Sequence, residues 1–194
     1  MIDGTARDVG APTEPAGNMR AAIAVLALAA GFALIPRATK GCEGVSLDEE
    51  APAFEAKIVA NAGVLAADGE ANPTRLRLES LRGRTVVLDF WATWCGPCQA
   101  EAPIVNTIAQ RYKDRGLAVV GVNTSDEDGL AAHFVRAKRL GFPVVYDEGN
   151  RIASAYHVSN LPTLIVISKT GKVVAIRQGV TSDSALDEIV RRYL

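Results

Sequence analysis

The chain contains 194 residues, and 48% of them are hydrophobic, which is enough apolar material for one compact domain with a packed core. Its 21 basic and 22 acidic residues give a formal net charge of −1, and no basic stripe is interleaved with aromatic residues. This pattern excludes the electrostatic footprint of a nucleic-acid-binding protein.

The N-terminal part of the chain differs in composition from the rest. Residues 1–18 are rich in Gly, Pro, Ala and Asp and are expected to be disordered. Residues 21–35 are an unbroken run of apolar residues and glycine. As a helix this run would reach about 22 Å, whereas the hydrocarbon core of a bilayer is about 30 Å thick. We therefore predict a signal peptide or a signal anchor at residues 19–36. A buried soluble helix is the alternative, although the run has no polar face.

Residues 37–46 are predicted to be a linker, and they contain Cys42. Three interpretations of this cysteine are open. It suits lipidation because Gly41 precedes it, but Thr39 and Lys40 depart from a bacterial lipobox. It also suits a plain linker position, or a disulfide to another chain in an oxidising compartment.

The strongest chemical signal is the segment Trp94-Cys95-Gly96-Pro97-Cys98, which lies between an apolar run at 85–91 and a segment predicted to be helical. Two cysteines with this spacing between a strand and a helix are placed for thiol–disulfide exchange. Unpaired N–H groups at the helix start would stabilise a thiolate at Cys95. Cys98, one turn further on, is expected to be more buried.

The residues around the two cysteines are assigned to substrate binding, namely Trp94, Gly96 and Pro97. Pro97 suits the first helical turn because it has no N–H to leave unpaired. Gly96 lets a partner sulfur come close to the backbone.

Further along the chain, a strand is predicted at 117–123, followed by a helix that Ser125 caps and that ends at Gly141. The buried face of this helix is predicted to contain Leu130, Phe134 and Ala137. Residues 142–146 are predicted to form a short edge strand. Apolar runs at 164–167 and 173–176 flank a turn and predict a hairpin. A last helix shows buried positions at helical spacing, namely Leu186, Ile189, Val190 and Tyr193.

Zinc binding is the rival interpretation of the cysteine pair. A structural zinc site needs four protein ligands, often a second cysteine pair or a pair of histidines. The chain has one other cysteine and two histidines, His133 and His157, neither of them near a second ligand cluster in the sequence. We therefore predict a redox pair with no metal or other cofactor, and we treat both histidines as structural.

The segment Asp89-Phe90-Trp91-Ala92-Thr93-Trp94-Cys95-Gly96-Pro97-Cys98 resembles the active-site signature of the thioredoxin superfamily. With the continuation to Pro103 it gives the pattern WCxPCxxExP, which is similar to that of the TlpA/ResA group. Residues 158–164 resemble the group's cis-proline loop. The resemblance covers about residues 47–194. It implies a thioredoxin-like α/β domain there, with a central mixed sheet flanked by helices, preceded by an N-terminal extension.

The resemblance implies a thiol–disulfide oxidoreductase in the bacterial cell envelope, on the periplasmic side and either membrane-anchored or exported. It would reduce disulfides of exported proteins, including those of cytochrome c maturation, through a redox disulfide between Cys95 and Cys98. Its partners would be protein thiols and disulfides and a membrane-embedded electron donor. The bond before Pro162 would be cis, and the backbone of Leu161 would pair with an extended substrate strand.

Residues 51–54 resemble the lead into an N-terminal hairpin, whereas residues 61–70 are an insertion without an assigned function.

Two carboxylates complete the predicted catalytic set. Asp89 aligns with the buried aspartate of thioredoxin and would accept the proton of Cys98. Burying a charged side chain in an apolar strand is costly, which favours a functional role for this residue. Glu101 matches the acidic residue of the WCxPCxxExP pattern and shares a helix face with Cys98. Solvent-exposed positions are the alternative for both. Because two nearby carboxylates disfavour each other's ionisation, at least one pKa is expected to rise. Many members of the group carry Asn at the position of Asp89, so this chain has a redundant pair.

Two other functions are considered. A peroxidase of the peroxiredoxin class uses the same fold, but such proteins lack a vicinal WCxPC motif. A non-catalytic binding module on a redox fold is the second alternative, and the presence of Cys95, Cys98, Asp89 and Pro162 argues against a decayed site.

Overall fold

The computed structural model describes residues 45–64 and 73–194. Residues 1–44 and 65–72 lie outside it, and with them the predicted disordered segment, the predicted signal segment, most of the linker with Cys42, and part of the insertion. The described strands are β1 (Glu55–Ala60), β2 (Arg75–Arg77), β3 (Thr85–Trp91), β4 (Leu117–Asn123), β5 (Val144–Tyr146), β6 (Thr163–Ile167) and β7 (Val173–Gln178). The described helices are α2 (Gly96–Tyr112), α3 (Leu130–Lys138), α4 (Arg151–Ala155) and α5 (Asp183–Tyr193), with short 3₁₀ turns η2 (Leu78–Leu81), η3 (Lys113–Arg115) and η4 (Glu148–Asn150).

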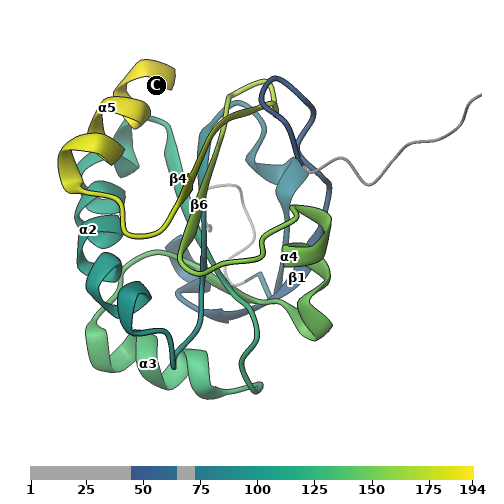
Figure 1. Ribbon diagram of the computed structural model, residues 1–194, viewed down its shortest axis with the longest axis vertical. Helices are drawn as coiled ribbons and strands as arrows, with labels where there is room; N and C mark the ends of the chain where they lie inside the picture. The colour runs from purple at the N-terminus through teal and green to yellow at the C-terminus, as the bar shows by residue number, and fades with distance from the viewer. Residues whose placement is uncertain (1–44, 65–72) are drawn as a thin grey trace, which may run out of the picture. The chain divides into compact units, whose positions relative to one another are not determined.

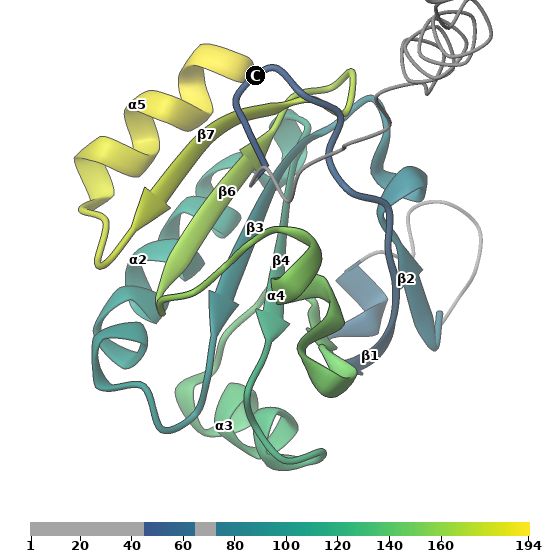
Figure 2. The same ribbon diagram turned by 45° about the vertical axis from the view of Figure 1, so that its right-hand side comes forward.

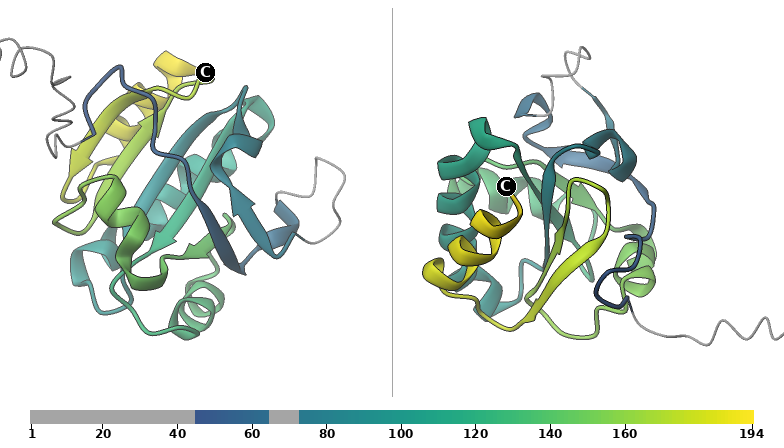
Figure 3. Two further views of the ribbon diagram at one scale, coloured as in Figure 1. Left: turned by 90° about the vertical axis from the view of Figure 1, so that its right-hand side faces the viewer. Right: turned by 90° about the horizontal axis from the view of Figure 1, so that it is seen from above.

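The strands form one mixed sheet in the order β2-β1-β5-β4-β3-β6-β7. Strands β3, β4 and β5 run parallel, and β6 returns antiparallel beside β3. Helices α2 and α5 cover one face of the sheet, and α4 lies on the other (Figures 1 and 2). The mixed sheet flanked by helices is the predicted architecture, and the left view of Figure 3 looks onto the face that carries α4.

Strand β3 is the centre of this arrangement, because all seven of its residues are buried and it pairs on both sides. Its β-branched and aromatic residues favour an extended backbone. Alternate residues point to opposite faces of a strand. Val87 and Trp91 pack in the core under α2 and α5, whereas Leu88 and Phe90 pack in the core under α4. Asp89, between Val87 and Trp91 in this alternation, therefore points toward the α2 side.

The end of the chain folds as predicted. Strands β6 and β7 form the hairpin, and α5 buries Leu186, Ile189 and Val190 against the sheet. Tyr193, the fourth predicted position, is half-buried against the same core. The hydroxyl of Ser182 accepts the N–H of Ala185 at 3.3 Å and caps this helix. The predicted N-terminal hairpin is also present, as the antiparallel pair of β1 and β2.

Strand β5 is not at the edge of the sheet, so the prediction for residues 142–146 was wrong. It pairs with β4 on one side and with β1 on the other. A short apolar strand has the same local pattern at an edge or inside a sheet, and the pairing with β1 spans more than 80 residues of chain. The local pattern therefore contains no information about this neighbour.

The helix predicted to begin at Ser125 begins at Leu130 instead. Ser125 has a left-handed φ of 57°, and its N–H donates to Asn150 Oδ1 at 2.7 Å, so this residue belongs to a loop. The buried residues of this helix are Ala131 and Val135. Of the three predicted positions, Phe134 is half-buried and packs against the core, whereas Leu130 is 47% exposed and Ala137 is exposed. Leu130 and Ala137 are apolar but lie off the face that packs against the core, so apolar spacing alone misassigned them.

The helix α3 also ends earlier than expected, at Lys138 rather than at Gly141. Arg139 adopts a left-handed φ of 54°, and its N–H bonds back to the carbonyls of Arg136 and Val135. A left-handed residue after the last turn closes a helix whether or not it is glycine.

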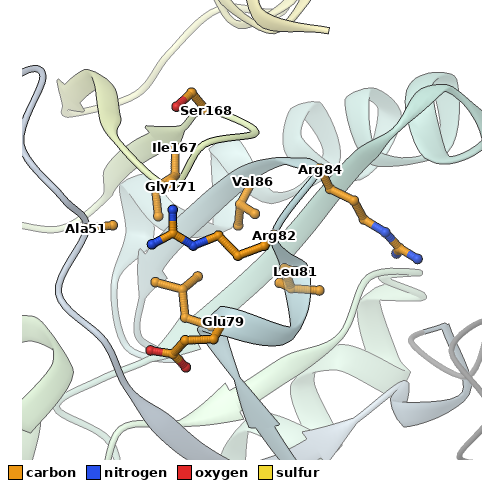
Figure 4. A pocket seen from close by; sticks show the side chains of 10 residues that line it. Ala51, Glu79, Leu81, Arg82, Arg84, Val86, Ile167, Ser168 and Gly171 are labelled. Atoms are coloured by element: carbon orange, nitrogen blue, oxygen red, sulfur yellow. The ribbon is translucent and has the colours of Figure 1, made fainter.

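The described chain begins at the end of the sheet that is remote from Cys95. The N–H of Asp48 donates to the Val173 carbonyl at 2.8 Å, at the start of β7. Nearby, the Arg82 guanidinium lies beside Gly171, as Figure 4 illustrates. The same guanidinium donates to Glu50 at 2.8 Å. These contacts attach the segment before β1 to the β6–β7 turn.

None of the described helices is long and apolar enough to cross a membrane.

Candidate active site

Cys95 and Cys98 are joined by a disulfide at the point where β3 gives way to α2. Cys95 is the N-cap residue of α2, and its Sγ accepts the N–H of Cys98 at 3.2 Å. The first N–H groups of a helix have no partner within it and carry partial positive charge. After reduction, this contact would stabilise a thiolate at Cys95 more than a thiol.

The two cysteines are equally buried, each 4% exposed, so the expectation that Cys98 is the more buried one was wrong for the disulfide form. The reason is geometric: the side chain of the N-cap residue turns back over the helix start to meet Cys98. What is exposed is the surface around the disulfide, namely Gly96, Pro97 and the Trp94 side chain, which is 65% exposed.

The loop before β6 lies at the same end of the sheet. The bond between Leu161 and Pro162 is cis, as predicted. Phe90 pairs with Thr163 in the β3–β6 register, so Pro162 lies beside the residues that follow β3 and lead to Cys95. Pro162 is buried and Leu161 is half-buried.

A third segment at this end, between β7 and α5, was missed by the sequence analysis. The N–H of Gly179 donates to the Pro162 carbonyl at 2.9 Å, and Val180 is 53% exposed. Together with Trp94 this adds apolar surface near the disulfide. No local pattern marks Val180, because its position depends on the pairing of β6 with β7.

Asp89 is 4% exposed, which rules out the alternative of a solvent-facing strand residue. Its burial raises the pKa of the carboxyl well above the usual value, and the charge of Glu101 raises that pKa further. Among the described residues, no side chain or backbone group donates a hydrogen bond to this carboxyl that would offset its burial.

Glu101 is 1% exposed, so the exposed alternative is wrong for this residue as well. Burial raises the pKa of its carboxyl, and a hydrogen bond from the Thr181 N–H, at 2.7 Å to Oε1, opposes part of that effect. Its second oxygen, Oε2, is buried and has no hydrogen-bond partner in the described part of the chain. That oxygen is free to take a proton.

The site therefore combines a disulfide at a helix start, two buried carboxyls on the same side of the sheet, and exposed apolar groups around the sulfurs. Such a set can form and break disulfides and hold a proton between the steps. His133 and His157 are exposed and lie outside this set. Within the described ranges, no group of three or more His, Cys, Asp or Glu side chains is arranged to hold a metal ion.

Comparison with known proteins gives consistent matches. The Redoxin family model matches residues 47–190. The thiol-disulfide oxidoreductase ResA of Bacillus subtilis (strain 168) is 31% identical over 164 residues, which cover 84% of this chain and 85% of that protein. ResA of Bacillus thuringiensis (strain Al Hakam) is 34% identical over 150 residues, covering 77% and 80% of the two chains.

Solved structures show the same similarity. A crystal structure from Chlorobium tepidum, described as a thiol:disulfide interchange protein DsbE, has a TM-score of 0.66 and 28% identity, and the match covers 77% of this chain and 99% of that one. A second structure from Chlorobium tepidum TLS, a thioredoxin family protein, has a TM-score of 0.62 and 25% identity, with 76% and 97% coverage.

The raised pKa of Asp89 predicts how stability depends on pH. Because the folded protein holds this proton more tightly than the unfolded chain, whose Asp pKa is about 3.9, stability is highest below that value and falls as pH rises through the folded pKa. Asp89→Asn should therefore raise the unfolding free energy of the oxidised protein at pH 8 by about 1–3 kcal/mol, with the gain shrinking toward pH 4. Urea unfolding followed by tryptophan fluorescence measures this.

Asp128→Asn is the matched control, because Asp128 is exposed and pairs with Lys57 at 3.1 Å. It should change stability by no more than about 0.5 kcal/mol at either pH. A loss of stability in Asp89→Asn that is equal at pH 8 and pH 4 would contradict the prediction.

Proposed function

The chain belongs to the Redoxin family and is a thiol–disulfide oxidoreductase similar to ResA, and from this premise we propose that it reduces disulfides of exported proteins through Cys95 and Cys98. The observation that carries the proposal is the contact of Cys95 Sγ with the N–H of Cys98 at the start of α2. This contact supports the proposal that Cys95 is the sulfur stabilised as a thiolate, and therefore the nucleophile.

The proposed reaction begins with the reduced protein. The Cys95 thiolate attacks one sulfur of a substrate disulfide, the substrate S–S bond breaks, and one substrate sulfur leaves as a thiolate. Cys98 then loses its proton and attacks Cys95 Sγ. The mixed disulfide breaks, the second substrate sulfur leaves, and the Cys95–Cys98 disulfide forms. Two electrons have passed to the substrate, and a dithiol protein, proposed to be membrane-embedded, restores the reduced state.

The buried carboxyls are proposed to receive the Cys98 proton. Burial raises the pKa values of both Asp89 and Glu101, which makes their carboxylates stronger bases and better proton acceptors. Glu101 Oε2 has no hydrogen-bond partner among the described groups and is free to bind the proton. The two residues share one function in this proposal.

The substrate is proposed to bind over the exposed rim of the site. An extended segment pairs with the backbone of Leu161 and places its sulfur over Gly96 and Pro97, while Trp94 and Val180 contact its apolar side chains. This mode suits unfolded or partly folded proteins, since strand pairing reads the backbone rather than a particular sequence. Apocytochrome c before haem attachment is a substrate of this kind.

The place of action is proposed to be the bacterial cell envelope, on its periplasmic side. Residues 19–36 would serve as signal peptide or signal anchor after a disordered segment at 1–18, and residues 37–46 would link them to the domain at 47–194. The described chain starts at the end of the sheet remote from Cys95, which supports an anchor that leaves the disulfide accessible.

Export is tested with a reporter fused after Lys40. An enzyme that is active only outside the cytoplasm, such as alkaline phosphatase, should be active in this fusion, because the upstream apolar run directs export. A fusion that lacks residues 21–35 is the control and should be inactive. Activity of a cytoplasm-specific reporter alone would refute the proposal.

The roles of the two cysteines are tested by trapping. Cys98→Ser should accumulate mixed disulfides on Cys95, because the resolving sulfur is missing, and Cys95→Ser should abolish insulin disulfide reduction. Non-reducing gels and mass spectrometry of the trapped adducts give the result. Preferential alkylation of Cys98 in the reduced native protein would reverse the assignment.

The shared role of the carboxyls is tested by single and double changes. Glu101→Gln keeps an acceptor for the Thr181 N–H, and either it or Asp89→Asn alone should slow resolution of the mixed disulfide by about threefold or less, since the other carboxyl remains. The double change should slow that step by about 100-fold. Stopped-flow kinetics across pH measure it. Wild-type rates in all three variants would show that water takes the proton.

A further inference from the structure

The loop that follows β4 holds the turn that carries Cys95. The carboxylate of Asp126 accepts three hydrogen bonds: from Thr93 N at 2.6 Å, from Thr93 Oγ1 at 2.8 Å and from Asn123 Nδ2 at 2.6 Å. Thr93 lies two residues before Cys95, and Asp126 lies 33 residues after Thr93. A carboxylate with several short hydrogen bonds makes a strong and directional contact.

The polar groups of Thr93 are bound from two sides. Asp126 takes its N–H and its hydroxyl, and the Thr93 carbonyl accepts from Gln99 Nε2 at 2.9 Å. The turn itself is closed by the N–H of Cys95, which donates to the Ala92 carbonyl at 3.2 Å. The backbone between β3 and α2 is therefore fixed at Thr93 from the β4 side and from the helix side.

The next residue, Trp94, is held by the same loop. Its Nε1 donates to the Ser125 carbonyl at 2.8 Å, although most of the indole is exposed. Ser125 is itself fixed in a left-handed conformation by Asn150, whose Oδ1 accepts both the Ser125 N–H at 2.7 Å and the Thr124 hydroxyl at 2.9 Å. Strained backbone of this kind persists where surrounding contacts define it, often at functional sites.

We propose that Asp126 is a positioning residue for the dithiol: by fixing Thr93 it keeps Cys95 Sγ over the N–H of Cys98 and so sustains the reactivity of the Cys95 thiolate. This inference rests on the proposed function. Asp126 touches neither sulfur nor substrate, and it acts through the turn between β3 and α2.

The sign of one measurement separates this role from a simple charge effect. A negative charge near Cys95 disfavours the thiolate, so removing the charge of Asp126 alone would lower the pKa of Cys95. Loss of the positioning contact moves Sγ away from the helix N–H groups and raises that pKa. The other ionisable groups of the site, Asp89 on β3, Glu101 on α2 and Cys98, stay unchanged in the variants.

The experiment measures iodoacetamide alkylation of Cys95 from pH 4 to pH 9 in the reduced full chain, with mass spectrometry to separate it from Cys98. Asp126→Ala should raise the pKa of Cys95 and slow alkylation at pH 6 by about fivefold, the scale of one lost capping contact. Asp128→Asn removes a charge from the same loop but bonds only Lys57 among the described residues, and should leave the profile unchanged.

Thr93 supplies a second pair of variants that perturbs the fold less. Thr93→Val removes the hydroxyl and keeps the N–H, and should shift the Cys95 pKa in the same direction by a smaller amount. Thr93→Ser keeps a hydroxyl and should match the unmodified protein.

Exposure of Trp94 gives an independent readout, since acrylamide reaches it more easily than the buried Trp91. Fluorescence anisotropy of the quenchable tryptophan should fall in Asp126→Ala.

An unchanged or lowered Cys95 pKa in Asp126→Ala, or in Thr93→Val if the first variant fails to fold, would overturn the inference. The proposed function is judged separately, by whether the unmodified chain reduces insulin. If it does and the Asp126 variant keeps the normal alkylation profile, the positioning role fails and the function stands. If the unmodified chain does not reduce insulin, the proposed function fails whatever the variants show.

Discussion

Burial of β3 along its whole length is the constraint on which the rest of the structure depends. The neighbouring strands position the site because β4 ends, and β6 begins, at the level where β3 ends. The parallel register with β4 brings Asn123 beside Trp91, and the antiparallel register with β6 brings Thr163 beside Phe90. The turn with Cys95, the loop with Asp126 and the cis-proline loop therefore meet at one edge of the sheet. Their mutual placement follows from strand pairing, which is rigid, rather than from the loops themselves.

The same burial accounts for the chemistry of the two carboxyls. A charged carboxylate without donors is costly to bury, and Asp89 lies in an otherwise apolar strand with apolar side chains on both sides. Glu101 is stabilised through one oxygen by the Thr181 N–H, while the other oxygen has no partner among the described atoms. The fold thus tolerates two groups that are unfavourable as charges, and the compensation comes from the large apolar core around them. Buried carboxyls with shifted pKa values are typical of functional sites.

Much of the fold and of the site could be predicted from local sequence, because the signals are local. The spacing of Cys95 and Cys98, the apolar run into them, the final amphipathic helix and the last hairpin each depend on residues near one another in the chain. The burial of Asp89 followed from its apolar strand. Features that depend on distant pairing could not be predicted. The interior position of β5 results from its pairing with β1. The later start of α3 results from Ser125, which bonds to Asn150, and from Asp126, which bonds to Thr93, so that neither caps a helix.

The disulfide joins residues only three apart, within one helical turn. A cross-link restrains an unfolded chain more strongly when the loop that it closes is longer, and this loop is among the shortest that a protein can form. The strands and helices that build the domain are held by pairing and packing, and no two distant elements are tied together by sulfur in the described structure. Reduction of the disulfide is therefore expected to leave the domain folded. The domain can therefore accept and donate an electron pair repeatedly, because its fold does not depend on whether Cys95 and Cys98 are oxidised or reduced.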